Sequence, residues 1–224
     1  MKIEFWSDII CPYCGLMDHR LRAAVRRHGA EVRVVHRSFQ LHPDLPRTGV
    51  TQRELIKLAG APASTVDQVL RPIERAADAE GLSPYQAVDR TLGPTDHAHE
   101  LLAYATDQGR GDEIWAAMFR AHFGAARRLW TLAEVLDFAA EVGLADAGPA
   151  LRDRRYRDRV EADQLAAQRL GARGAPFVVI DDRYAVPGAI TTDELLAVLD
   201  QARRPARLPI IAAGGDACGP GGYC

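Results

Sequence analysis

The sequence lacks the long apolar runs and the excess of one charge that mark several protein classes. Its longest apolar runs are far shorter than the roughly 20 residues that cross a bilayer, so we expect no membrane partner. The 28 basic and 30 acidic residues are spread along the chain and give a net charge of −2, which argues against nucleic acid as a partner. With four cysteines among 224 residues the chain is also cysteine-poor, and each pair needs its own explanation.

The first residues show no export signal. Glu4 and Asp8 interrupt the apolar residues, and the pair Cys11–Cys14 follows at once. We therefore expect a cytoplasmic protein. Cytoplasmic thiols are mostly kept reduced, so a CxxC pair there is typical of catalysis or metal binding and not of a structural disulfide.

The two ends of the chain predict β-structure with helices between strands. Residues 2–7 and 31–39 alternate as strands do, and apolar residues at three- and four-residue spacing predict a helix over 12–28 that ends at Gly29. Near the other end, 175–181 and 183–188 predict a hairpin that turns at Asp181–Asp182. A helix over 191–202 opens with a Thr/Asp cap. The pattern is β-α-β at the start and β-β-α at the end.

The middle of the chain predicts helices and no strand between 51 and 169, with glycines and prolines at the corners. Trp115 and Phe119 lie at helical spacing and are interpreted as core residues. The length suits one domain with a substantial insertion or two small domains. After residue 204 the chain is rich in glycine and proline and contains the second cysteine pair, Cys218 and Cys224.

The spacing Cys11-Pro12-Tyr13-Cys14 suits thiol chemistry at a strand-to-helix junction. Cys11 becomes the N-cap, Pro12 the first helical residue and Cys14 the third, so both sulfurs share one side. The helix dipole and the N–H groups of the first turn favour an anionic Cys11 sulfur, which would lower the pKa of that thiol. We expect Cys11, on the exposed rim, to attack disulfides and Cys14 to resolve them, with Pro12 and Tyr13 adjusting the redox potential.

The sequence leaves two interpretations open for each of two residues, Asp8 and His99. Asp8 is interpreted either as an exposed cap at the strand end or as a buried carboxylate that helps to deprotonate Cys14. His99 is interpreted either as a cation above Cys11 or as a packed or surface histidine. His97 and His99 are two residues apart and would not face the same way on a helix, so they form a poor metal pair.

Three stretches together resemble the DsbA family of thiol–disulfide oxidoreductases, and within it the FrnE-like branch. They are FWSDIICPYC at the start, TDHAHEL at 95–101 and EADQLAAQRLGARGAPFVVIDDRYAVPGA at 161–189. The resemblance implies an α/β, thioredoxin-like fold, with residues 1–45 and 170–204 forming the thioredoxin-like domain. An all-helical insertion domain would take up 46–169, and 205–224 would form a tail.

The resemblance also implies site residues. Cys11 would be the nucleophile, Cys14 the resolving thiol and Pro176 a cis-proline that faces the cysteines, with the backbone of Ala175 pairing with substrate. Cys218 and Cys224 would form a second redox pair. The substrates would be disulfide- or thiol-containing proteins or small molecules, with no cofactor and with glutathione as a candidate co-substrate; the oligomeric state stays open.

Two alternatives remain. Kappa-type glutathione transferases and chromene-carboxylate isomerases share this fold and use glutathione, usually with serine in place of Cys11. A zinc-stabilised binding or holdase protein would use the four thiols, Cys11, Cys14, Cys218 and Cys224, as a tetrahedral metal site.

Overall fold

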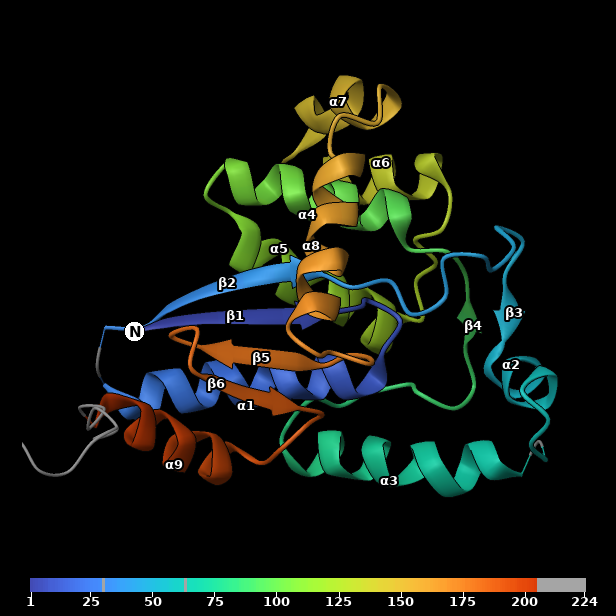
Figure 1. Cartoon of the computed structure of the whole chain (residues 1–224). Coiled ribbons are helices and arrows are strands. Elements are labelled where there is room, and N and C mark those ends of the chain that lie inside the picture. Colours follow the sequence, from blue (N-terminus) through green and yellow to red (C-terminus); the bar gives the residue numbers. More distant parts are fainter. Residues whose placement is uncertain (30, 63, 205–224) are drawn as a thin grey trace, which may run out of the picture.

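A four-stranded mixed sheet forms the centre of the computed structural model, which describes residues 1–29, 31–62 and 64–204 (Figure 1). Its strands, in spatial order, are β2 (Arg33–Ser38), β1 (Lys2–Ser7), β5 (Phe177–Ile180) and β6 (Tyr184–Pro187). β1 pairs in parallel with β2 and antiparallel with β5, and β5 pairs antiparallel with β6. The predicted thioredoxin-like order of elements is therefore confirmed.

Helices cover both faces of this sheet. On one face α1 (Pro12–His28) and α9 (Thr192–Arg203) enclose a core with the apolar side chains of β1 and β5 (Figure 1). On the other face α8 (Arg157–Arg169) packs beside Trp6 and Phe177. The indole N–H of Trp6 donates to the backbone carbonyl of Asp163 at 2.8 Å, which fixes α8 on the sheet.

The segment between β2 and β5 is mainly helical, as predicted. It contains α2 (Gln52–Leu58), α3 (Thr65–Ala79), α4 (Asp96–Asp107), α5 (Gly111–Phe119), the π-helical turn η1 (Arg120–Gly124), α6 (Leu132–Glu141), the 3₁₀ turn η2 (Ala145–Ala147), α7 (Gly148–Arg152) and α8. Trp115 and Phe119 are buried there, which confirms their interpretation as core residues.

The expectation of no strand between 51 and 169 is wrong at one place. β3 (Val50–Thr51) pairs antiparallel with β4 (Thr91–Leu92), beside the helix α2 (Figure 1). Two residues are too short a run for the alternation that marks a strand in a sequence. The pair ties residues that lie about 40 positions apart, and tertiary contact alone produces it.

The element boundaries follow the predictions closely. The helix expected over 12–28 spans those residues, whereas the strands expected over 31–39, 175–181 and 183–188 are shorter at their ends. Asp181 and Asp182 form the hairpin turn with φ of 49° and 54°, a left-handed conformation that aspartate tolerates. The domain boundaries at 45/46 and 169/170 stay predictions, and the tail 205–224 lies outside the described residues.

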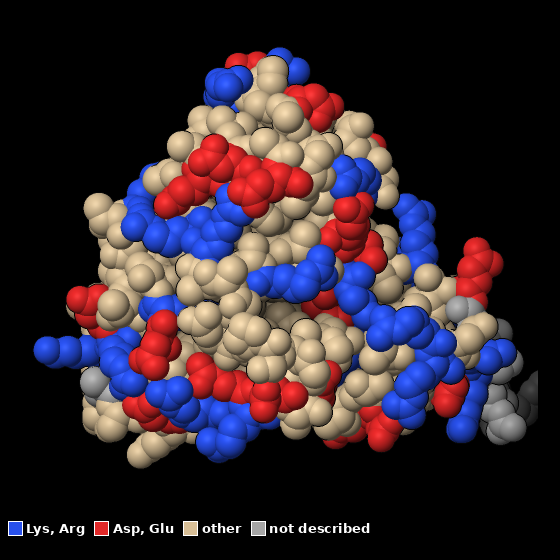
Figure 2. Space-filling view, turned by 180° about the vertical axis from the view of Figure 1, so that it is seen from behind, with Lys and Arg blue, Asp and Glu red and all other residues tan. Residues whose placement is uncertain are grey.

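Charges of both signs are mixed on the surface. On the face shown in Figure 2, acidic and basic side chains lie next to one another with uncharged surface between them. This agrees with the net charge of −2. Among the helices that the structure describes, none has both the length and the apolar content to cross a membrane.

Candidate functional site

The two cysteines of the CPYC sequence lie at the start of α1. Cys11 is the N-cap, with extended φ and ψ of −83° and 113°, and Pro12 is the first helical residue. The Cys14 N–H donates to the Cys11 carbonyl at 3.0 Å, which closes the first turn. Both cysteines are free thiols in this structure. The predicted placement at a strand-to-helix junction is confirmed.

The prediction that Cys11 lies on an exposed rim is wrong, because only 3% of the residue is exposed. Its Sγ lies 3.5 Å from the carbonyl oxygen of Ala175, to which the thiol donates. No hydrogen bond joins the Cys11 side chain to the N–H groups of the first turn, contrary to expectation, and the Cys14 and Gly15 N–H groups donate to the Cys11 carbonyl instead. Tyr13, 41% exposed, is the open part of the CPYC sequence.

The loop before β5 lies against Cys11. The Ala175–Pro176 peptide bond is cis, as the resemblance implied. Pro176 is buried and Ala175 is half-buried, so this loop forms one side of the thiol site. Sequence positions 11 and 175 are brought together because β1 and β5 are adjacent strands.

Cys14 is completely buried, and this separates the two thiols chemically. Burial raises the pKa of the Cys14 thiol well above its usual value, and the hydrogen bond with Cys11 and the charge of Cys11 raise it further. Cys14 therefore keeps its proton at neutral pH. Only a local change, such as a bond formed at Cys11, would alter that protonation.

Asp8 is a buried carboxylate and not an exposed cap. Its Oδ2 accepts from the Leu41 N–H at 2.6 Å, and its Oδ1 lies 3.4 Å from His99 Nε2. Burial acts to raise the pKa of Asp8, but the nearby His99 and the hydrogen bond from the Leu41 N–H outweigh it and hold that pKa below its usual value. An ionised Asp8 contributes a negative charge that raises the pKa of Cys14.

His99 is packed inside the molecule, which is the second of its two interpretations. It is fully buried on α4 and meets the ring of Trp115 edge-on, with ring centroids 5.6 Å apart. Its contact with Asp8 joins α4 to the β1–α1 junction. The helical segment thus reaches the thiol site through this pair.

Sequence reasoning missed a second buried group, which contains Tyr85, Arg90 and His122. The Tyr85 hydroxyl donates to the carbonyl of Pro12, inside the CPYC sequence. Burial, and next the charge of Cys11, raise the pKa of Tyr85 well above its usual value, so it remains a donor. Tyr85 stacks on Phe123 with ring centroids 4.6 Å apart.

Arg90 is a buried cation held by neutral partners. It donates to the Ala87 carbonyl at 3.0 Å, to Gln52 Oε1 at 3.1 Å and to His122 Nε2 at 2.7 Å, and it lies 4.9 Å from the centroid of the Phe123 ring. Burial lowers the pKa of Arg90 to about 10, although the nearby acidic groups of Tyr85, Cys11 and Asp8 act to raise it. Arg90 therefore stays charged at neutral pH, and Cys11 is among the groups that interact electrostatically with it.

His122 completes this group as a neutral imidazole. Burial and the charge of Arg90 lower the pKa of His122 to about 3. Its Nδ1 lies 3.0 Å from the Arg127 carbonyl and donates to it, which leaves Nε2 to accept from Arg90. The sequence places His122 at helical spacing with Trp115 and Phe119, but no periodic pattern marks Tyr85 and Arg90, because they lie in the irregular stretch between α3 and β4.

Two predicted features lie partly outside the described residues. Cys218 and Cys224 both belong to the tail, so the second redox pair and the four-thiol zinc site stay predictions. Within residues 1–29, 31–62 and 64–204, no group of three or more His, Cys, Asp or Glu side chains converges in a way that fits a metal ion.

Comparisons with known proteins agree with this arrangement. The family model for the DSBA-like thioredoxin domain matches residues 2–200. The structure is similar to a probable DsbA oxidoreductase from Streptomyces coelicolor, with 33% identity over 98% of both chains and a TM-score of 0.83. Similarity in fold extends to the cytosolic disulfide reductase DsbM from Pseudomonas aeruginosa, with 19% identity over 91% of this chain and 95% of DsbM and a TM-score of 0.60. A 2-hydroxychromene-2-carboxylate isomerase matches with 15% identity over 90% of this chain and 94% of the isomerase, at a TM-score of 0.61. No curated protein matches the sequence.

Proposed function

Because the chain belongs to the family of DSBA-like thioredoxin domains, whose members are disulfide oxidoreductases, we propose that it exchanges disulfides through Cys11 and Cys14. The two residues would alternate between a dithiol and a disulfide. The observation that carries the proposal is the difference between the thiols: Cys14 is fully buried and holds its proton, whereas Cys11 lies at the helix N-terminus beside Ala175.

The reduction of a substrate proceeds in two steps. The Cys11 sulfur, as thiolate, attacks one sulfur of the substrate disulfide, so that a mixed disulfide forms and the other substrate sulfur leaves as a thiolate. Cys14 then loses its proton and attacks Cys11 Sγ, which forms the Cys11–Cys14 disulfide and releases the second substrate thiolate. Oxidation of a dithiol substrate is the same sequence in reverse.

Charged and polar groups around the thiols support these roles. In the structure with two free thiols, the negative charge of Asp8 and the burial of Cys14 both oppose ionisation of Cys14. Once Cys11 is tied up in a mixed disulfide, its hydrogen bond and charge no longer keep the proton on Cys14. The change at Cys11 therefore favours ionisation of Cys14 at the step that needs it.

We assign substrate contact to Pro12, Tyr13, Ala175 and Pro176. Tyr13 is exposed and Pro12 half-buried, so a substrate reaches Cys11 past them. The carbonyl of Ala175 lies next to Cys11 Sγ and becomes an acceptor for a substrate N–H when the thiol proton is gone.

The proposed substrates are proteins or small molecules that contain a disulfide or a dithiol, and glutathione is the proposed reductant that regenerates the dithiol. One neighbour of similar fold, DsbM, is described as cytosolic and has been solved with GSH. We propose a cytoplasmic location and membership of the FrnE-like branch, on the strength of the sequence stretches that resemble it.

Replacing each thiol tests the roles. Cys11→Ser is expected to abolish glutathione-driven reduction of insulin, and Cys14→Ser is expected to trap a mixed disulfide that adds one substrate mass to the chain. The matched control is the double variant, which should trap nothing. Full activity in both single variants would contradict the assignment.

The glutathione-transferase alternative has its own measurement. Calorimetric titration of fully reduced Cys11→Ser with reduced glutathione separates the two functions, because a thiol forms no disulfide with another thiol unless an oxidant is present. Tight binding to this variant would favour the transferase interpretation, and weak or absent binding agrees with thiol exchange.

A further inference from the structure

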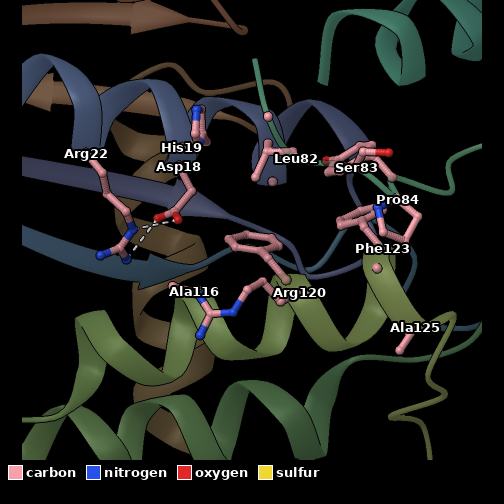
Figure 3. A pocket seen from close by; sticks show the side chains of 15 residues that line it. Asp18, His19, Arg22, Leu82, Ser83, Pro84, Ala116, Arg120, Phe123 and Ala125 are labelled. Atoms are coloured by element: carbon pink, nitrogen blue, oxygen red, sulfur yellow. Dashed lines mark hydrogen bonds and ion pairs between the residues drawn. The ribbon is translucent and has the colours of Figure 1, made fainter. Parts of the chain in front are cut away.

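A cavity of about 330 Å³ lies between α1, the loop of residues 81–85 and the junction of α5 with η1 (Figure 3). Pockets for small molecules fall in a range of about 300–1,000 Å³. None of the four residues of the CPYC sequence lines it, but Gly15, the next residue, does. It is therefore a space separate from the thiols and one residue away from them.

One part of the cavity is apolar. Leu82, Pro84, Phe119 and Phe123 contribute aliphatic and aromatic surface, and in Figure 3 Pro84 and Phe123 lie together at one end. Phe123 is itself buried and stacked on Tyr85, so this wall is firmly held. Such a surface receives an aromatic or aliphatic group of a ligand.

The other end of the cavity carries charged side chains of both signs. Arg22 pairs there with Asp18 at 2.8 Å and also with Asp112 at 2.5 Å, so two carboxylates engage Arg22 and Arg120 is the cation that remains to meet an anion. Arg120 is exposed on η1, and its guanidinium lies on the Arg22 side in Figure 3. In the described part of the chain no ion pair within 4.0 Å engages Arg120; the charge of Glu113 reaches it, but Glu113 is paired with Arg110 at 2.6 Å. His19 lines the cavity beside Asp18.

Because one end of the cavity is apolar and the other presents Arg120, we propose that the cavity is a binding site for a small amphiphilic anion. Such a ligand has an aromatic or aliphatic body and one carboxylate or sulfonate. The body lies against Leu82, Pro84 and Phe123, and the anionic group faces Arg120. The proposal does not depend on disulfide exchange, since it concerns a space that the thiols do not line.

The site shares a wall with the thiol site. Tyr85 lines the cavity and donates its hydroxyl to the carbonyl of Pro12. A ligand that presses on Tyr85 and Phe123 thus contacts a side chain that holds the CPYC turn. Binding is accordingly expected to change the environment of residues 11–14 as well as that of the cavity.

The experiment titrates the full reduced chain with 2-naphthoate and, as the uncharged match, with 2-naphthamide. We expect one 2-naphthoate per chain by calorimetry and affinity about tenfold weaker for the amide, since a charge-assisted contact is lost. Chemical-shift mapping is expected to place the largest changes at Leu82, Phe123 and Arg120. Equal affinity for acid and amide, or shifts confined to another surface, would overturn the proposal.

Two variants and a control locate the site. Arg120→Gln removes the exposed charge and is expected to weaken 2-naphthoate about fivefold while leaving 2-naphthamide unchanged. Ala116→Phe fills the cavity and should prevent binding of both. Arg33→Gln, an exposed arginine of β2 away from the cavity, should change neither affinity. Unaltered 2-naphthoate binding by Arg120→Gln would count against the site even if Ala116→Phe failed to fold.

Discussion

At the scale of single residues, the lack of a side chain at Gly15 shapes the thiol site. A Cβ at this position would lie 2.5 Å from the Tyr85 hydroxyl and 3.1 Å from the Phe123 ring, closer than such atoms approach. Gly15 therefore allows Tyr85 to reach the carbonyl of Pro12. Because Gly15 has no side chain, the group of Tyr85, Arg90 and His122 contacts the CPYC turn through Tyr85.

We expect Gly15→Ala to lower the free energy of unfolding by about 1 kcal/mol, measured by urea denaturation. The clash with Tyr85 costs roughly 1–3 kcal/mol, and the better helix propensity of alanine returns up to about 1 kcal/mol. Gly174→Ala is the matched control, because a Cβ there meets no atom within 4 Å. If Gly15→Ala were as stable as this control, Tyr85 would move away from the added methyl group without a loss of stability.

At the scale of elements, α9 is held by its first turn and by its apolar face. Thr191 and Glu194 form a capping box, in which each side chain accepts from the other residue's backbone N–H. Leu195 and Leu199 are fully buried against the sheet and α1. The cap satisfies N–H groups that the helix itself leaves free, so the helix starts at a fixed residue.

Thr191→Ala is expected to lower the free energy of unfolding by about 1 kcal/mol, the usual cost of losing an N-cap side chain. Thermal or urea unfolding followed by circular dichroism measures the change. Thr192→Ala serves as the control, since Thr192 is the first residue of the helix and takes no part in the box. Equal losses in the two variants would refute a specific role for the cap.

At the scale of the whole molecule, buried polar contacts join the sheet to the helical segment. Asp8 at the β1–α1 junction meets His99 of α4 at 3.4 Å. Asp163 of α8 accepts from the Ser38 N–H at 3.1 Å and pairs with Arg37 of β2. The cluster of buried residues that contains Cys11 and Cys14 also contains side chains from α4, α5 and α6. The helical segment is thus part of the environment of the thiols.

The Asp8–His99 pair predicts a specific sensitivity to acid. The folded pKa of Asp8 is below its unfolded value of about 3.9, so folding favours the ionised carboxylate. Its contribution to stability is therefore present above about pH 4 and is lost as the pH falls toward the folded pKa. Urea unfolding between pH 7 and 3 should show a shallower loss below pH 4 in Asp8→Asn than in the wild type.

The control for this measurement is Asp193→Asn, an exposed aspartate that pairs with Arg27 on the surface. If Asp8→Asn and the wild type lost stability with the same slope below pH 4, folding would not lower the pKa of Asp8, and the prediction would be wrong.

Features that depend on local patterns could be predicted from the amino-acid sequence. The 3.6-residue period and Gly29 placed α1, and Pro12 placed the helix start at Cys11. The aspartates at 181–182 marked the hairpin turn. Such features depend on neighbours along the chain, so composition and spacing suffice to predict them.

The surroundings of the thiols depend on the packing of distant segments and could not be predicted from local patterns. Cys11 is covered by Ala175, and Tyr85 and His99 reach the site from positions more than 70 residues away from it. Burial and pKa depend on atoms brought close by folding, and no local period records them. The cavity between α1 and η1 has the same origin, since it exists only where separate elements fail to fill the space between them.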